Sequence, residues 1–146
     1  MFKSTFVIFL LFYLLTANAE NAANRTYGNV IIAEVTSIYD GDTFRATING
    51  WPAIIGERIP IRINGIDAPE MKGKCQKEIQ LARQAKQFSV ERLRSAKKIE
   101  LRNLRREKYF RLLADVYVDG DNLGAMLMNK GLARTYGGGL KMSWCH

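Results

Sequence analysis

Three short runs of apolar and β-branched residues in the first half of the chain are typical of β-strands. They cover residues 30–38, 43–48 and 58–66, and branched side chains of this kind pack well on a pleated sheet. Asp40-Gly41-Asp42 joins the first two runs and has the composition of a tight turn. The pattern therefore predicts a three-stranded meander.

A helix is predicted next, over residues 77–95. Leu81, Ala85 and Phe88 recur at i, i+4 and i+7, which places them on one face, and basic residues occupy much of the remaining surface. We expect this helix to lie across the sheet with its apolar face inward.

The second half of the chain predicts two more strands, at 98–101 and 112–118, with the basic stretch 102–106 between them. Residues 119–122 form a turn with a potential helix cap, and a short helix over 123–130 follows, closed by Gly131. The predicted order is three strands, a helix, two strands and a second helix. This order indicates a mainly β fold of the α+β class. The best match is a five-stranded barrel of OB type with two to three helices.

The amino-terminal residues have the pattern of a secretory signal peptide. Lys3 precedes ten apolar residues at 6–15, and Ala17-Asn18-Ala19 provides a cleavage site before Glu20. A membrane anchor is the alternative, but ten residues are about half of the ~20 that a spanning helix needs. The predicted organisation is a signal peptide at 1–19, a flexible segment at 20–28 and one domain at 29–146. Export to a periplasmic or extracellular space, with no stable membrane association after cleavage, is expected.

The charge of the chain favours a polyanionic partner. Its 146 residues contain 22 Lys and Arg against 14 Asp and Glu, a net charge of +8. Nucleic acid and anionic surfaces both attract such a protein. No amphipathic basic helix with a bulky apolar face stands out, so nucleic acid is favoured. The length suits a single domain, which we expect to be a monomer.

Cysteine and histidine usage restricts the chemistry. Cys75 and Cys145 are the two cysteines, and in an oxidising compartment they are expected to form a disulfide. The only histidine is the terminal His146, so no interior imidazole is available as a zinc ligand, a general base or a nucleophile's partner. Catalysis would have to use carboxylates, guanidinium groups, water and a metal ion.

Polar groups concentrate at the end of the third predicted strand. Arg62 lies within it, and Asp67-Ala68-Pro69-Glu70 follows. Pro69 fixes its own φ and favours an extended Ala68, so Asp67 and Glu70 are presented by a stiff turn. The alternative is that Asp and Pro merely end the strand.

The tripeptide Asp-Gly-Asp occurs twice, at 40–42 and at 119–121, and either copy can be turn chemistry alone. In a meander, however, the 40–42 turn and the 67–70 turn can converge and gather four carboxylates. Such charges repel by roughly 1 to 4 kcal/mol per pair, so the cluster favours a cation. Oxygen ligands without histidine or thiolate favour Ca²⁺ or Mg²⁺.

Four ordered pieces of the chain carry a family resemblance that spans nearly the whole predicted mature chain. They are Tyr39-Asp40-Gly41-Asp42-Thr43, Arg62 through Asp67-Ala68-Pro69-Glu70, Lys108-Tyr109-Phe110-Arg111, and Asn129-Lys130-Gly131-Leu132-Ala133. The chain resembles a secreted, bacterial-type member of the staphylococcal nuclease (thermonuclease) family. The resemblance implies an OB-like barrel, one Ca²⁺ per chain, and hydrolysis of phosphodiester bonds in DNA and RNA that leaves 3′-phosphate ends.

The resemblance also implies roles for individual residues. Asp42 and Asp67 match the calcium carboxylates, Ala68 the main-chain carbonyl ligand, and Asp40 a position near the metal without direct contact. Arg62 and Arg111 match the two phosphate-binding arginines, and Glu70 matches the glutamate beside the attacking water. The residues that match nucleotide contacts are Lys108, Tyr109 and Tyr136.

The chain departs from the family pattern at three places. Ala68 replaces a Thr, Phe110 replaces a Gly, and the long carboxy-terminal helix is largely absent. The Cys75–Cys145 disulfide would secure the shortened end.

Physical chemistry supports the implied roles. Arginine suits a phosphorane-like transition state because its planar fork binds two oxygens and stays charged. Glu70 would orient the water or accept its proton, and both roles remain open. Alternatively, Arg62 closes the sheet, Arg111 is a surface charge and Glu70 solvates a turn. The rival function is an OB-type module that binds nucleic acid without cutting it. The acids favour the nuclease, since they repel phosphate and serve no purpose in binding alone.

Overall fold

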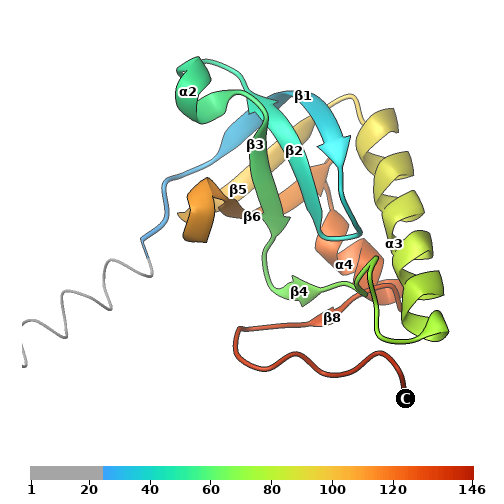
Figure 1. Ribbon diagram of the computed structural model, residues 1–146. Coiled ribbons are helices and arrows are strands. Elements are labelled where there is room, and N and C mark those ends of the chain that lie inside the picture. Colours follow the sequence, from blue (N-terminus) through green and yellow to red (C-terminus); the bar gives the residue numbers. More distant parts are fainter. Residues whose placement is uncertain (1–24) are drawn as a thin grey trace, which may run out of the picture.

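The structure, a computed structural model, describes residues 25–146 and contains a closed five-stranded barrel. The predicted signal peptide at 1–19 and most of the 20–28 segment lie outside the described residues. The barrel strands are β1 (Val30–Ile38), β2 (Thr43–Ile48), β3 (Ile59–Ile63), β5 (Ile99–Arg106) and β6 (Leu112–Val118). They pair in the order β3-β2-β1-β5-β6, and a parallel β3–β6 pairing closes the ring (Figure 1). The predicted OB-type barrel is confirmed.

Two helices pack against this barrel. The long helix α3 (Gln76–Ser95) runs along one side of it, as Figure 1 shows, within a residue of its predicted bounds. Of its predicted apolar face, Ala85 is fully buried, while Leu81 and Phe88 are partly buried against the core. Helix α4 (Leu123–Asn129) begins at Asn122, whose side-chain oxygen accepts the N–H of Ala125 at 2.8 Å, and the predicted cap is therefore confirmed.

The remaining elements are short and connect or extend the barrel. They are helix α2 (Ala53–Gly56), strand β4 (Ile66–Asp67), the 3₁₀ turn η1 (Lys108–Phe110), strand β7 (Asp121–Asn122) and strand β8 (Arg134–Thr135). Sequence reasoning did not predict α2, whose four residues are too few to show a period.

The core is built by inward-facing strand residues and by α4. Strand β6 alternates buried and half-buried positions along its whole length, as expected for a strand with one face inward. The largest fully buried apolar side chains are those of Phe44, Ile48, Ile61, Ile63, Ile66, Leu101, Leu104, Val116, Leu123 and Leu127.

Two strand boundaries differ from the prediction. The third strand does not run from 58 to 66, because the chain turns at Asn64-Gly65, where Gly65 has φ +76°. Asn64 donates its N–H to the carbonyl of Ala114 at 2.8 Å, and Ile66–Asp67 leaves the barrel to pair with Arg134–Thr135.

The basic stretch 102–106 was expected to separate two strands, and it instead continues β5. A bulge at Asn103, with φ +52°, shifts the alternation so that Leu104 points into the core and the arginines point outward. The pairing of Arg105 with Leu113 and of Arg106 with Leu112 extends the strand to the site end of the barrel.

The structure contains the predicted Cys75–Cys145 disulfide, with Cα atoms 5.9 Å apart. It links the start of α3 to the last residues of the chain. No helix within residues 25–146 has the length and apolar character needed to cross a membrane.

Candidate active site

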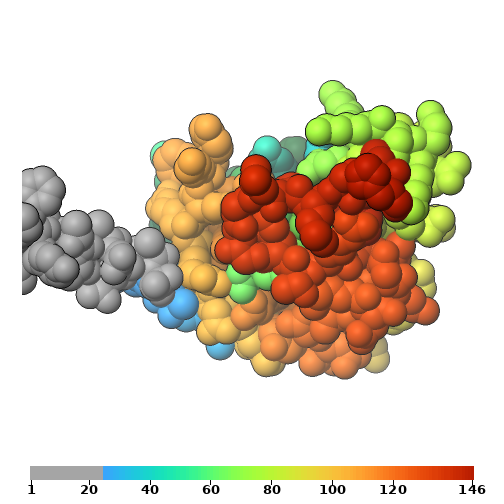
Figure 2. Space-filling model, turned by 90° about the horizontal axis from the view of Figure 1, so that it is seen from below, coloured from blue at the N-terminus to red at the C-terminus, as the bar shows by residue number. Residues whose placement is uncertain are grey.

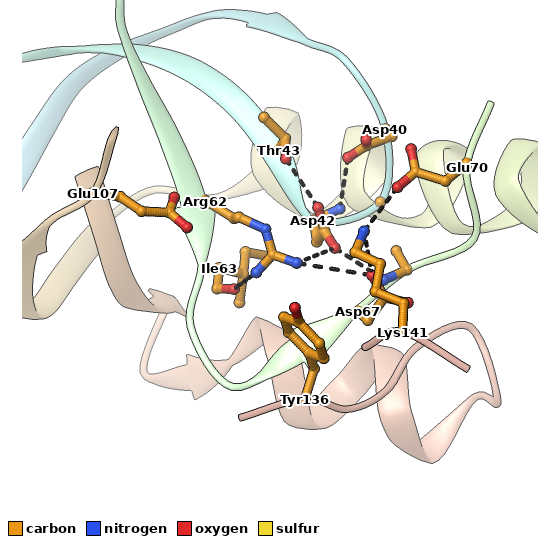
Figure 3. A network of polar contacts seen from close by, with 12 residues as sticks. Asp40, Asp42, Thr43, Arg62, Ile63, Asp67, Glu70, Glu107, Tyr136 and Lys141 are labelled. Atoms are coloured by element: carbon orange, nitrogen blue, oxygen red, sulfur yellow. Dashed lines mark hydrogen bonds and ion pairs between the residues drawn. The ribbon is translucent and has the colours of Figure 1, made fainter. Parts of the chain in front are cut away.

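Strand pairing brings Asp42 and Arg62 together at one end of the barrel. Thr43 of β2 lies opposite Arg62 of β3, and Ile63 donates its N–H to the carbonyl of Asp42 at 2.8 Å. Arg62 Nη2 lies 3.5 Å from Asp42 Oδ2 and 3.8 Å from Asp67 Oδ1 (Figure 3). All three side chains are less than 10 % exposed, so this cluster is shielded from solvent.

Helix α3 positions the 40–42 turn. Ser89 donates its hydroxyl to the Gly41 carbonyl at 2.7 Å, and a Cβ at Gly41 would lie 2.7 Å from the Cβ of Ala85. Gly41 is therefore needed for close approach to the helix. At the second copy, Gly120 has φ +95° and nothing within 4 Å of a would-be Cβ. The two Asp-Gly-Asp copies thus use glycine for different reasons, and only the first joins the site.

Asp42 is the centre of a hydrogen-bond network. Its Oδ1 accepts the hydroxyl of Thr43 at 2.9 Å, and its Oδ2 accepts the N–H of Ala68 at 2.9 Å. The second contact confirms that the 40–42 and 67–70 turns converge. Asp40 Oδ1 in turn accepts the Asp42 N–H at 3.0 Å. Ala68 contributes its N–H here, and its predicted role as a carbonyl ligand remains a prediction.

The electrostatics of these acids favour a cation. Burial, together with the negative charge of Asp42, raises the pKa of Asp40 to about 7. Placing two negative charges in so small a volume is unfavourable unless a positive charge is supplied. The positive charge of Arg62 alone therefore does not balance the negative charge of the acid cluster.

Asp67 presents a buried carboxylate oxygen, Oδ1, to two cationic side chains. The ammonium of Lys141 lies 2.7 Å from Oδ1, and Arg62 Nη2 lies 3.8 Å from it. Asp67 Oδ2 accepts the indole N–H of Trp144 at 3.4 Å. A buried carboxylate oxygen whose neighbours are cationic, close to a second carboxylate at Asp42, suits a hard divalent cation. The residues present therefore fit such an ion.

Lys141 joins the two predicted acids. Its Nζ also lies 2.8 Å from Glu70 Oε1. Burial lowers the pKa of Lys141, but hydrogen bonds and charge from Asp67 and Glu70 outweigh this effect and raise it on balance. The ammonium therefore stays charged within the cluster.

A cleft of about 360 Å³ opens beside the cluster and holds both predicted arginines. Arg111 follows η1, and its Nε contacts Glu107 Oε2 at 2.5 Å. The parallel pairing of Arg62 with Leu113 brings Arg111 to the same barrel end as Arg62. The residues lining the cleft are Tyr39, Asp40, Asp42, Thr43, Arg62, Glu70, Glu107, Arg111, Tyr136 and Lys141.

Most of the predicted site residues are therefore gathered in one place. Tyr136 joins them through its ring, which lies 5.6 Å from the guanidinium carbon of Arg62. Lys108 and Tyr109 do not line the cleft. They lie in η1 next to Arg111, where Tyr109 is 91 % exposed with φ +59°.

Sequence reasoning missed Lys141, Trp144 and Glu107. The first two lie in a carboxy-terminal segment without secondary structure, so no period marks them. A signal was present, however, because the Cys75–Cys145 disulfide places residues near 145 only a few positions from Glu70. Figure 2 shows this segment, in red, spread across the face between the 70–80 region in green and the 100–112 region in light orange.

A second grouping of potential ligands has a structural role. Within residues 25–146, three such ligand atoms within 4.8 Å of one another occur at Cys75, Glu78 and Cys145. The two sulfurs form the disulfide and offer no thiolate. Glu78 instead accepts the N–H of Lys74 at 2.9 Å and that of Glu70 at 3.4 Å, which orders the loop carrying Glu70.

Comparison with known proteins identifies the family. Residues 60–141 match the family described as "Staphylococcal nuclease homologue". The chain belongs to the staphylococcal nuclease family. It is 32 % identical over 137 residues to "Probable endonuclease LCL3" of Colletotrichum graminicola, covering 78 % of this chain and 49 % of that protein.

Two further relatives of the family also come from fungi. A protein of Schizosaccharomyces pombe named "Probable endonuclease" is 29 % identical over 83 % of this chain and 62 % of its own length. The Pyricularia oryzae LCL3 protein is 30 % identical over 73 % of this chain and 49 % of its own length. The chain thus spans about half the length of most of these relatives. Their fungal origin does not bear out the bacterial type expected from the sequence.

Proposed function

We propose that this protein is a metal-dependent nuclease that hydrolyses phosphodiester bonds of DNA and RNA as an endonuclease, with 3′-phosphate products. The observation that carries the proposal is the cleft lined by Arg62, Arg111, Asp42 and Glu70. Asp67 lies next to this cleft, 3.8 Å from Arg62. Two fixed cations can hold a phosphate, and the acids supply a metal site and a group for water. The names of the relatives and the family membership support the same activity.

The chain's own residues account for most of the chemistry. Arg62 is held by Asp42, Asp67 and the ring of Tyr136, so its charge is oriented before substrate arrives. Arg111 is held at one nitrogen by Glu107, which leaves other N–H groups for phosphate oxygens. Charge developing on those oxygens would be stabilised by both guanidinium groups.

Asp42 and Asp67 would hold a hard divalent cation, and Ca²⁺ is the ion we propose. When bound, the ion would act as a Lewis acid toward the phosphate. Glu70, with a half-exposed side chain, would orient a water molecule or accept its proton. Asp40 would tune the charge of the cluster through its contact with Asp42.

Export is part of the proposal, supported by the apolar run at 6–15 and the cleavage pattern at 17–19. The disulfide agrees with an oxidising compartment. A net charge of +8 would attract nucleic acid to the protein.

The alternative is a module that binds nucleic acid without cleaving it. Exposed Tyr109 and Phe110 beside basic residues favour stacking on bases, which binding alone would use. The buried acids oppose this alternative, since their charge repels phosphate.

Two substitutions separate these functions. Glu70→Gln should abolish most cleavage while nucleic-acid binding is retained. Arg111→Ala should lower the cleavage rate by about 10² to 10³, the usual loss when one transition-state donor is removed, with a much smaller effect on affinity. Both are measured by single-turnover cleavage and by fluorescence anisotropy in Ca²⁺.

Matched controls exist on strand β5. Arg102 has similar exposure to Arg111 and also pairs with a glutamate, Glu100, at 3.0 Å, but it lies outside the cleft. Arg102→Ala and Glu100→Gln should therefore cleave at the parent rate. If the parent binds DNA and RNA without cleaving either, with Ca²⁺ present, the binding module is correct. If Glu70→Gln cleaves at the parent rate, Glu70 has no part in the mechanism.

A further inference from the structure

Lys141 already contacts one of the two carboxylates that would hold the proposed metal ion. Its Nζ is 2.7 Å from Asp67 Oδ1 and 2.8 Å from Glu70 Oε1 (Figure 3). Asp67 Oδ1 is buried and has no hydrogen-bond partner beyond this ionic contact. The ammonium therefore compensates both carboxylates, and Arg62 adds a second, more distant cation 3.8 Å from Asp67 Oδ1.

We propose that Lys141 is an internal counter-ion that competes with the divalent cation, so that metal binding requires its ammonium to leave Asp67 and Glu70. This inference rests on the proposed function, since it concerns the same metal site. Lys141, in the carboxy-terminal segment, would thereby control the affinity of the site for metal.

Geometry makes the two cations mutually exclusive. A Ca²⁺ ion takes carboxylate oxygens at about 2.3–2.6 Å, nearly the distance at which Lys141 Nζ already contacts Asp67 Oδ1. A metal ion held by Asp67 and the Lys141 ammonium would therefore both bind the same buried oxygen, Asp67 Oδ1. Two positive charges cannot share that position without strong repulsion.

The segment that carries Lys141 is anchored on both sides. Before it, Tyr136 donates its N–H to the carbonyl of Gly65 at 2.8 Å. After it, the Trp144 indole contacts Asp67 and Cys145 is bonded to Cys75. The ammonium is consequently held at a high effective concentration beside the acids.

The same segment allows Lys141 to withdraw. Its side chain is 42 % exposed, so the ammonium can turn into solvent without breaking core contacts. Gly137, Gly138 and Gly139 precede it, and the last two have φ +107° and +84°, which gives local backbone freedom. Displacement by a metal ion therefore needs no opening of the barrel.

Metal affinity in Lys141→Met tests the proposal. Met keeps the length of the stem and removes the charge. Calcium affinity is measured by isothermal titration calorimetry. Terbium affinity is measured by sensitised luminescence, for which Trp144 beside Asp67 is a suitable donor. We expect the dissociation constants for both ions to fall about tenfold, equivalent to ~1.4 kcal/mol.

Lys98→Met is the matched control. Lys98 also pairs with a glutamate, Glu100, at 3.8 Å, and its side chain is 57 % exposed. It precedes β5 at the barrel end opposite Arg111, because Ile99 pairs with Val118 and Arg106 with Leu112. The net charge changes equally in both variants, so a general electrostatic effect would appear in both. We expect Lys98→Met to bind metal within twofold of the parent.

A second measurement uses the parent protein and does not depend on a variant folding. Amine acetylation, quantified by mass spectrometry at each lysine, should rise at least threefold at Lys141 when Ca²⁺ is added and stay constant at Lys98. A Lys141→Met variant with unchanged or weaker metal affinity would overturn the proposal, as would Lys141 labelling that is unchanged or lowered by Ca²⁺.

The failure of this inference is distinguishable from that of the proposed function. If the parent binds Ca²⁺ and cleaves with it, but Lys141→Met has the parent's affinity, the counter-ion role alone is wrong. If the parent neither binds metal nor cleaves nucleic acid, the proposed function is wrong and the inference is wrong with it.

Discussion

Replacing Gly41 by Ala should disable the acid cluster while leaving the fold intact. A Cβ at this position would lie 2.7 Å from the Cβ of Ala85 and 3.1 Å from that of Ala68, both attached directly to backbone. Real Cβ atoms essentially never approach to 2.7 Å, so the 40–42 turn must move away from α3. Asp40 and Asp42 flank the new side chain and would move with the turn.

The size of the effect follows from this overlap. Overpacking typically costs about 1–3 kcal/mol, and in a domain of this size each kcal/mol lowers Tm by about 4 °C. A carboxylate displaced by about 1 Å can lose 10² in rate. We therefore expect Gly41→Ala to lose roughly 4–12 °C in Tm and about 10² in cleavage rate, measured by calorimetry and single-turnover cleavage.

The second Asp-Gly-Asp copy provides the control. Gly120→Ala meets no atom within 4 Å but adopts φ +95°, which costs about 1–2 kcal/mol of backbone strain. It should lose comparable stability and keep the parent cleavage rate. Comparison of the two Asp-Gly-Asp copies thereby separates the effect on stability from the effect on catalysis.

A rescue variant tests the cause directly. Ala85→Gly removes the Cβ that Gly41→Ala would strike, although Gly within a helix costs roughly 1 kcal/mol. Relief of the overlap and the helix cost oppose each other, so the double variant should be about as stable as Gly41→Ala and yet recover part of the lost activity. Parent-like activity in Gly41→Ala, or no recovery in the double variant, would show that contact with α3 does not position the acids.

Three further predictions follow from the metal site, the disulfide and the α4 cap. Cleavage should require a millimolar-range hard cation and stop in excess chelator, and full activity in chelator would contradict the metal site. The double substitution Cys75→Ser and Cys145→Ser opens a loop spanning 70 positions, and chain entropy sets an upper limit of ~4 kcal/mol on the loss of unfolding free energy. Denaturation in urea measures this loss, and a variant as stable as the parent would exclude a stabilising disulfide. Asn122→Ala removes the cap of α4 and should lower the unfolding free energy by about 1 kcal/mol. Cleavage by the folded protein should not change, since α4 does not line the cleft, and a loss of activity greater than the loss of folded protein would refute this.

Local patterns determined the main elements of the fold. The strands at 30–38, 43–48 and 112–118 and the long helix α3 match their predicted bounds almost residue for residue. Their signals are short-range: β-branched runs, a helical period and turn residues act over a few positions and need no partner. Part of the cleft was identified in the same way, because Asp42, Arg62 and Glu70 occur in compact motifs beside predictable strand ends.

Tertiary structure decided what depends on contacts between distant segments. The strand over 58–66 breaks at Asn64-Gly65 because Ile66–Asp67 finds a partner in Arg134–Thr135, and no local pattern encodes that pairing. Gly41 and Gly120 stand in identical tripeptides, yet one is required by the approach of α3 and the other by its own φ.

The position of Lys141 at the candidate active site likewise depends on contacts between distant segments. Lys141 follows three glycines in a segment without periodicity, and only the barrel, the β4–β8 pairing and the Cys75–Cys145 disulfide bring it to Asp67 and Glu70. A charge acts through space over a few ångströms, whereas a sequence pattern records only neighbours along the chain. The sequence thus determined which acidic and basic residues are available to the cleft, and the folded chain decided which cation lies against the acids.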